Sequence, residues 1–146
     1  MQPVKSLNHI GIAVNSIAAH RSFYEHTLGA VYEGEECVAD QKVRVAFFRI
    51  GDVRLELLEP TDPASVLQAF LDRRGEGLHH IAFTVDKLED RIAEWKASGL
   101  RMIDEVPRVG AHQMRIAFAH PKSTGGVLTE LCEPLAQTPV ARPDSV

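Results

Sequence analysis

The chain has 146 residues, of which 45% are hydrophobic and 25% are charged, a composition typical of one ordinary globular domain. A formal net charge of −4 and the lack of a dense Lys/Arg patch interleaved with aromatic residues argue against nucleic-acid binding. No run reaches the roughly 18 apolar residues that would cross a bilayer, and the polar start lacks a signal-peptide core, so we expect a cytoplasmic protein without a membrane partner. Cys37 and Cys132 stand far apart, which predicts neither a disulfide nor a thiolate metal site.

The first half of the chain predicts a strand, a helix closed by a glycine, and two further β-rich runs: residues 9–14, 15–29, 42–50 and 52–60. Residues 62–75 then predict a joining helix, with Pro63 in its first turn and Gly75 near its end.

The second half repeats this order in residues 80–85, 86–99, 113–121 and 125–134. Its helix is the better defined of the two, because Asp86 is placed to cap it and Glu89 completes a capping box. Gly99 is expected to end this helix, and the tail 135–146 is expected to be loose.

The strongest organisational feature is therefore an internal repeat with a period of a little over 70 residues. "HIGIAV" at 9–14 returns as "HIAFTV" at 80–85, and "LELLEP" at 55–60 returns as "TELCEP" at 129–134. We expect one domain, 1–146, with internal modules at about 5–60 and 76–134 joined by the helix at 62–75.

The repeat selects two histidines. Because side chains alternate along a strand, His9 and His80 occupy equivalent positions on faces that otherwise carry small residues, whereas His79 falls on the opposite face. The small residues on the histidine faces suggest a cavity. We therefore expect His80 to be functional and His79 to be structural.

The repeat also pairs Glu56 with Glu130, each among apolar residues where an unpartnered carboxylate would be costly to bury. Glu59 and Glu133 correspond as well, but they lie at strand exits beside prolines and are expected to be solvated. Two histidines and two glutamates at equivalent places suggest one divalent metal ion. A duplicated core with charged strand ends would give the same repeat, but buried glutamate is uncommon in strands, which favours the metal.

These residues resemble the vicinal oxygen chelate superfamily, and within it the methylmalonyl-CoA epimerase family. The resemblance runs from about Leu7 to Pro134 and is carried by "LNHIGIAV", "GEGLHHIAF", "VGAH" and above all "HPKSTGGVLTEL". It implies an α+β fold in which two tandem βαβββ modules form an open, cupped β-sheet around a metal site. It implies one divalent metal ion, which could be cobalt, manganese, zinc, nickel or magnesium. The ligands that it implies for this ion are His9, Glu56, His80 and Glu130.

The resemblance also implies a small-molecule CoA thioester substrate and interconversion of (2R)- and (2S)-methylmalonyl-CoA. Removal of the α-proton gives an enolate, whose charge a Lewis acid is well placed to stabilise. Glu130 is the firmer candidate base and Glu56 the candidate for the opposite face. Some members of the family carry a glutamate on the third strand, where this chain has Val45, so the second base stays open.

Three further residues are candidate substrate contacts, namely Lys122, Ser123 and His112. A homodimer is also expected. The alternatives are a glyoxalase I, which would move a proton in a glutathione hemithioacetal, a ring-cleaving dioxygenase, and a metal-free protein that sequesters a small molecule. A second glutamate argues against the dioxygenase, whose iron site uses two histidines and one carboxylate.

Overall fold

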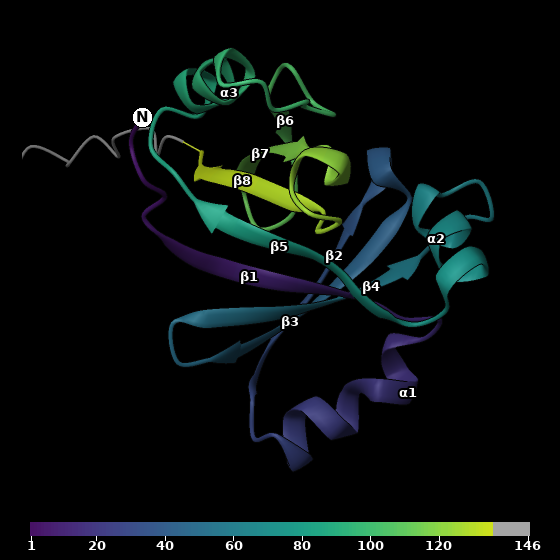
Figure 1. Cartoon of the computed structure of the whole chain (residues 1–146). Coiled ribbons are helices and arrows are strands. Elements are labelled where there is room, and N and C mark those ends of the chain that lie inside the picture. The colour runs from purple at the N-terminus through teal and green to yellow at the C-terminus, as the bar shows by residue number, and fades with distance from the viewer. Residues whose placement is uncertain (136–146) are drawn as a thin grey trace, which may run out of the picture.

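The structure, a computed structural model, describes residues 1–135 and consists of one eight-stranded sheet with three helices (Figure 1). The strands are β1 (Ser6–Ala13), β2 (Val31–Val38), β3 (Val43–Ile50), β4 (Val53–Pro60), β5 (Gly77–Thr84), β6 (Arg108–Val109), β7 (Met114–Ala119) and β8 (Thr129–Pro134). The helices are α1 (Ile17–Ser22), which continues as a π-helical segment (Phe23–Thr27), α2 (Val66–Arg74) and α3 (Leu88–Ala97). Apart from Leu135, the predicted loose tail lies outside the described residues. Among residues 1–135, no helix is long and apolar enough to span a membrane.

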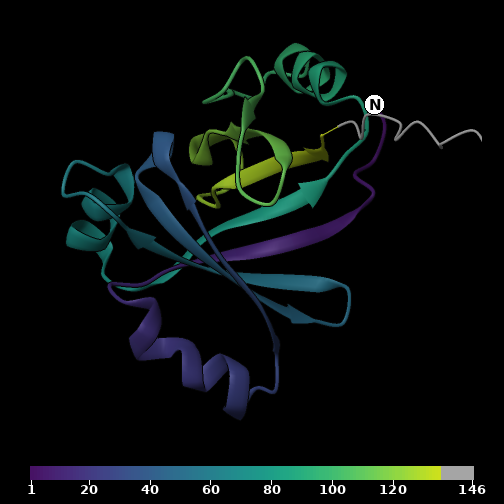
Figure 2. The ribbon, with the colours of Figure 1, turned by 180° about the vertical axis from the view of Figure 1, so that it is seen from behind.

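The sheet has the strand order β2-β3-β4-β1-β5-β8-β7-β6, so the two halves meet at the antiparallel pair of β1 and β5. On either side of this pair the arrangement is equivalent, because β1 runs parallel to β4 and β5 runs parallel to β8. The sheet is curled, as the opposite views of Figures 1 and 2 show. We call the face that carries His9 the inner face.

The helices divide between the two faces of the sheet as the apolar pattern predicts. On the outer face, Ile12 and Val14 pack with Ile17 of α1, and Val85 packs with Leu88 and other residues of α3. On the inner face, Leu67 of α2 packs beside Ala13 and Leu58 at one end of the sheet. The centre of the inner face is thereby left for polar side chains.

The helix starts differ from the prediction. Asp86 does not cap α3: Lys87 stands at the cap position with a left-handed backbone (φ 53°) and no side-chain hydrogen bond, while Asp86 pairs with Lys5. The Leu88 N–H instead donates to Glu133 Oε2 at 2.6 Å, so the expectation of a solvated Glu133 was wrong.

Two other helix boundaries involve a proline and a glycine. Pro63 precedes α2, whose N-cap is Ser65, rather than lying in its first turn. Gly99 (φ 93°) follows the last turn of α3, so the prediction that a glycine ends this helix is confirmed.

Two β-bulges interrupt the pairing of β1 with β5. Leu7 and His9 face Phe83 and Ala82, so Asn8 is an extra residue in β1. Gly11 and Ile12 face His80 and Leu78, so His79 is an extra residue in β5. A bulge re-aims side chains locally, and both of these stand directly before a histidine that the repeat selected.

Candidate metal centre

The inner face encloses a cavity of about 430 Å³. Polar residues from both halves line it, together with apolar side chains: His9, Glu56, His79, His80, Glu130, Val45, Leu58, Ile116, Phe118 and Leu128 are among them. The loop before β7 closes over the first half, where Ala111 packs against the apolar cluster that contains Val45. The site is thus an apolar pocket with a few convergent polar groups.

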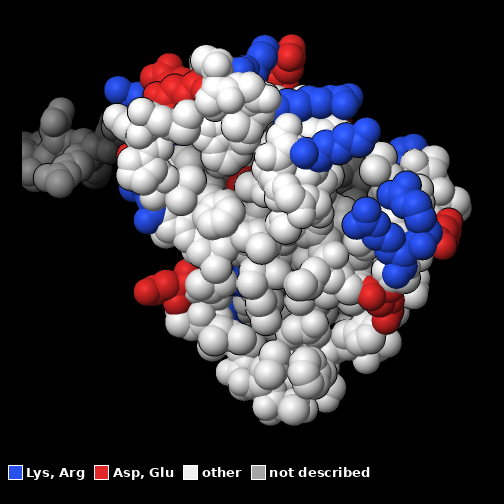
Figure 3. All heavy atoms as spheres, in the orientation of Figure 1, with Lys and Arg blue, Asp and Glu red and all other residues white. Residues whose placement is uncertain are grey.

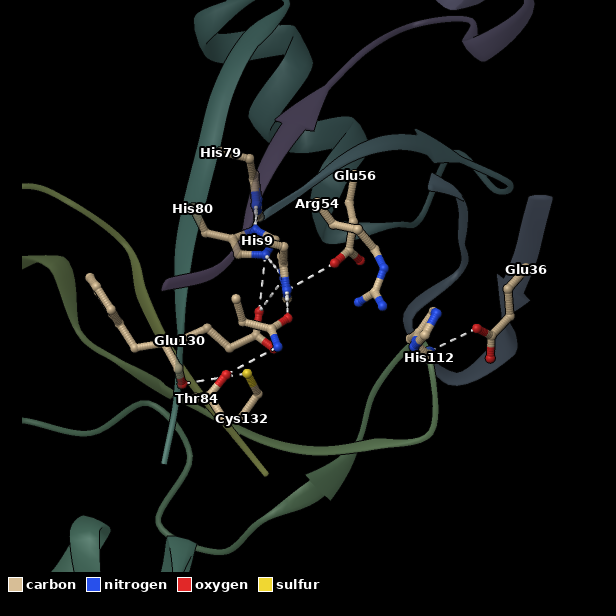
Figure 4. A network of polar contacts seen from close by, with 12 residues as sticks. His9, Glu36, Arg54, Glu56, His79, His80, Thr84, His112, Glu130 and Cys132 are labelled. Atoms are coloured by element: carbon tan, nitrogen blue, oxygen red, sulfur yellow. Dashed lines mark hydrogen bonds and ion pairs between the residues drawn. The ribbon is translucent and has the colours of Figure 1, made fainter. Parts of the chain in front are cut away.

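Three buried side chains meet at one point on the cavity wall (Figure 4). His9 Nε2 lies 3.0 Å from His80 Nε2, and Glu130 Oε2 lies 2.9 Å from His80 Nε2 and 3.3 Å from His9 Nε2. His9 comes from β1, His80 from β5 and Glu130 from β8. All three potential ligand atoms lie within 4.8 Å of one another, so one ion could contact all of them. Two imidazoles and one carboxylate are a donor set that suits a divalent transition metal.

Glu56 lies beside this cluster, against the other nitrogen of the His9 ring. Its Oε2 is 2.8 Å from His9 Nδ1, and its side chain is buried. The structure therefore brings three of the four expected ligands to one point and places the fourth as a carboxylate partner of His9. Such a partner orients a metal-binding histidine and raises its basicity.

The charges of the cluster follow from this packing. Burial lowers the pKa of His9, but hydrogen bonds with Glu130 and Glu56 outweigh it and raise the pKa from 6.5 to about 9. Burial raises the pKa of Glu130, but hydrogen bonds from His80 and His9 outweigh it and lower the pKa to about 2. At neutral pH, Glu130 is therefore ionised and His9 carries a proton that a metal ion must displace.

The position of His79 contradicts the expectation that it lies on the opposite face. Its Nδ1 is 2.9 Å from His80 Nδ1, and its ring lines the same cavity. The bulge is the physical reason, because the extra residue in β5 cancels the alternation between neighbouring side chains. Burial and the charge of His80 lower the pKa of His79 to about 4, so this imidazole is neutral at neutral pH.

The remaining predicted residues lie farther from the cluster. His112 is exposed on the loop before β7, where its N–H donates to Glu36 Oε2 at 2.8 Å and its ring stacks edge-on against Phe47. Lys122 and Ser123 are exposed in a 3-10 turn, and the Ser123 hydroxyl accepts from the Arg101 N–H at 2.9 Å. Neither of these two lines the cavity.

Asn8 is the polar residue that sequence reasoning missed. Its Oδ1 lies 2.8 Å from His9 Nδ1, and its Nδ2 donates to the Thr84 hydroxyl. The sequence did hold a signal, because aligning the two halves places Asn8 and His79 at equivalent positions, each directly before its histidine.

Residues 8–118 match the family model described as the Glyoxalase/Bleomycin resistance protein/Dioxygenase superfamily. The chain belongs to this superfamily. Its relatives include the uncharacterized protein YqjC of Bacillus subtilis, 49% identical over 128 residues that cover 88% of this chain and 91% of YqjC. Human mitochondrial methylmalonyl-CoA epimerase is 35% identical over 126 residues, which cover 86% of this chain and 72% of the human protein.

Solved structures that resemble this chain include methylmalonyl-CoA epimerases as well. A variant of Streptomyces coelicolor methylmalonyl-CoA epimerase, solved in complex with 2-nitronate-propionyl-CoA, superposes with a TM-score of 0.87 at 37% identity, covering 94% of this chain and all (100%) of the other. The α+β vicinal oxygen chelate fold and the resemblance to methylmalonyl-CoA epimerases are thereby confirmed, as is the prediction of an enzyme of this group.

Proposed function

We propose that the protein is a metal-dependent epimerase that interconverts (2R)- and (2S)-methylmalonyl-CoA. The observation that carries the proposal is the buried cluster of His9, His80 and Glu130, open to an apolar cavity, in a chain whose relatives include epimerases of that name. The reaction needs a proton to leave the α-carbon and to return on the other face. Glu130, the buried carboxylate of the cluster, is our candidate for the group that accepts this proton.

One divalent ion would be held by His9, His80 and Glu130. We propose Glu56 as the fourth ligand, for which its carboxylate would have to turn from His9 Nδ1, its present contact at 2.8 Å, toward the shared point. A bound ion would act as a Lewis acid toward substrate oxygens. Cobalt, manganese, zinc, nickel and magnesium are all candidates, since nitrogen and oxygen donors tolerate several metals.

The two carboxylates are proposed as the acid–base pair. Glu130 comes from β8 in the second half and Glu56 from β4 in the first half, so they approach the cavity from opposite sides of the β1–β5 pair. This arrangement suits removal of a proton from one face of the substrate α-carbon and its return to the other face. Val45 is buried and lines the cavity on β3, and it cannot exchange protons, which leaves Glu56 as our candidate for the second group.

The charge of the rim supports an anionic thioester as substrate. Lys42 and Arg108 line the cavity, one from each half, and Asp40 is the acidic residue beside Lys42. Lys and Arg side chains also gather on the α2 side of the molecule, whereas the centre of this face is largely uncharged (Figure 3). Such a rim suits the phosphates of CoA, while the apolar wall suits the acyl group.

A direct comparison of two substrates tests the proposal. Metal-loaded protein is incubated with (2S)-methylmalonyl-CoA in one reaction and with the glutathione hemithioacetal of methylglyoxal in another, and both are followed by NMR. We expect inversion at the α-carbon of the thioester and no conversion of the hemithioacetal. Conversion of the hemithioacetal alone would replace the epimerase with a glyoxalase I, and turnover of neither would overturn the proposal.

A further inference from the structure

The two histidines of the cluster share a local arrangement that the alternation of side chains along a regular strand does not produce. Each is preceded by the extra residue of a β-bulge, Asn8 in β1 and His79 in β5. In each case this extra residue contacts the Nδ1 atom of the histidine that follows it, at 2.8 Å for Asn8 Oδ1 and at 2.9 Å for His79 Nδ1. The arrangement therefore occurs once in each half, at equivalent positions of the repeat.

The chemical consequence concerns which ring nitrogen carries the hydrogen. A neutral histidine has one N–H and one lone pair, and a metal needs the lone pair. His9 and His80 direct Nε2 toward the shared point, so each must carry its hydrogen on Nδ1 to bind an ion there. An acceptor held against Nδ1 stabilises that tautomer.

Both bulge residues can supply this acceptor. Asn8 Oδ1 accepts directly, and its Nδ2 donates to Thr84, which holds the amide in that orientation. The His79 ring packs edge-on against Phe70 of α2 with the ring centres 4.8 Å apart, which restrains its orientation and holds its Nδ1 2.9 Å from His80 Nδ1. His79 Nδ1 can therefore accept from the His80 Nδ1–H.

We propose that Asn8 and His79 are positioning residues, which accept from the Nδ1–H of His9 and His80 when Nε2 of each ring binds a metal ion. The proposal rests on the metal site given above. In this proposal His79 is not a ligand. The two bulges place a hydrogen-bond acceptor beside Nδ1 of each metal-binding histidine.

The two positions differ in how much they should matter. His9 Nδ1 has a second acceptor, since Glu56 Oε2 also lies 2.8 Å from it. His80 Nδ1 has His79 as its hydrogen-bond partner within residues 1–135. We therefore expect loss of the His79 acceptor to weaken metal binding more than Asn8→Leu does.

The test compares His79→Asn, whose Oδ1 can take the place of Nδ1, with His79→Leu, which keeps a similar volume and removes the acceptor. Leu78→Asn is the matched control, because Leu78 is the neighbouring residue of the same strand and is 72% exposed. Cobalt affinity is measured by competition with a chelating dye. The hydrogen bond of the His80 Nδ1–H is read separately from ¹H–¹⁵N NMR spectra of the zinc-loaded protein.

We expect His79→Leu to weaken cobalt binding by about 10- to 100-fold, the range typical of a lost partner of a metal ligand, and to abolish the hydrogen bond of the His80 Nδ1–H. His79→Asn and Leu78→Asn should stay close to the unsubstituted protein in both measurements. If His79→Leu does not fold, His79→Gln replaces it. The glutamine acceptor falls at the position of the histidine Nε2, so it also leaves the position of Nδ1 without an acceptor.

An unchanged affinity and an unchanged His80 Nδ1–H signal in the variant without the acceptor would overturn the positioning role. Failure of the unsubstituted protein to bind any divalent ion would instead overturn the metal site itself. Cobalt binding by the unsubstituted protein keeps these two failures apart, because it tests the metal site independently of His79.

Discussion

Glu130 is the residue on which most of the proposed chemistry depends. It is buried, it contacts both histidines, and hydrogen bonds hold its pKa at about 2, so it stays ionised at any pH at which the enzyme would work. A carboxylate of such low pKa is a weak base on its own. To accept the α-proton, a Glu130 oxygen would therefore have to be free of the histidine hydrogen bonds and of a bound ion when the substrate is in place.

Glu130→Gln should reduce α-proton exchange by about 100- to 10,000-fold, the usual contribution of a general base, and weaken substrate binding far less. The amide keeps the size of the side chain but cannot accept the proton. NMR detection of deuterium uptake, with titration calorimetry of a substrate analogue as the control, measures both effects. Exchange at the unsubstituted rate would move the base to another residue.

His9 predicts a pH dependence of metal binding. Its pKa of about 9 in the metal-free protein means that below this pH an incoming ion must displace the proton on Nε2. Metal affinity should therefore rise about tenfold per pH unit from neutral pH and level off near pH 9, with about one proton released per ion. Calorimetry in buffers of different ionisation enthalpy counts these protons, and a flat affinity over this range would contradict the assigned charge.

At the scale of the strands, the pairing of β1 with β5 determines where the histidines point. Gly11 faces His80 across this pair, and the His80 ring lies over it. A Cβ on Gly11 would overlap the Cε1 and Nδ1 atoms of that ring. The glycine is therefore needed for space, since its backbone is not in the left-handed region.

Gly11→Ala should displace the His80 ring, lower metal affinity and destabilise the fold by about 1–3 kcal/mol, the usual cost of overpacking. In a His80→Ala background the same substitution should cost much less, because the overlapping ring is gone. Urea unfolding of the two single variants and the double variant measures this coupling. Equal costs in both backgrounds would show that Gly11 serves another purpose.

The start of α3 gives a second prediction at this scale. Glu133→Ala should destabilise the protein by about 0.5–2 kcal/mol, because it removes the acceptor of the Leu88 N–H at a helix N-terminus. Glu59→Ala is the matched control: Glu59 holds the equivalent place in the first half, and both glutamates face an arginine on the adjacent strand. Thermal unfolding compares the two, and equal losses would exclude a capping role.

Features that depend on local sequence patterns could be predicted, whereas features that depend on how distant segments pair could not. Alignment of the two halves was enough to select His9, His80 and Glu130, because strand position and apolar surroundings are local patterns. The face of His79 could not be predicted, because the bulge depends on how β1 pairs with β5. The acceptor for α3 could not be predicted either, because Glu133 lies 45 residues beyond Leu88.

For the whole molecule, the arrangement suggests why two halves are needed. The β1–β5 pair joins them at the centre of one sheet, and the cluster takes His9 from the first half and His80 and Glu130 from the second. We propose that residues 5–60 and 76–134 are modules of one domain, with an ion binding where they meet. The predicted homodimer stays a prediction, which analytical ultracentrifugation of the metal-loaded protein would test.

We propose that the protein removes and returns the α-proton of a methylmalonyl thioester only when a metal ion, which this cluster would hold, is bound. The most direct measurement is deuterium uptake at the α-carbon of methylmalonyl-CoA in D₂O, followed by NMR with metal-loaded, chelator-treated and metal-restored protein. We predict uptake with inversion in the loaded and restored samples and its loss on chelation. Uptake at an equal rate after the metal is removed, or no uptake with the metal bound, would contradict the claim.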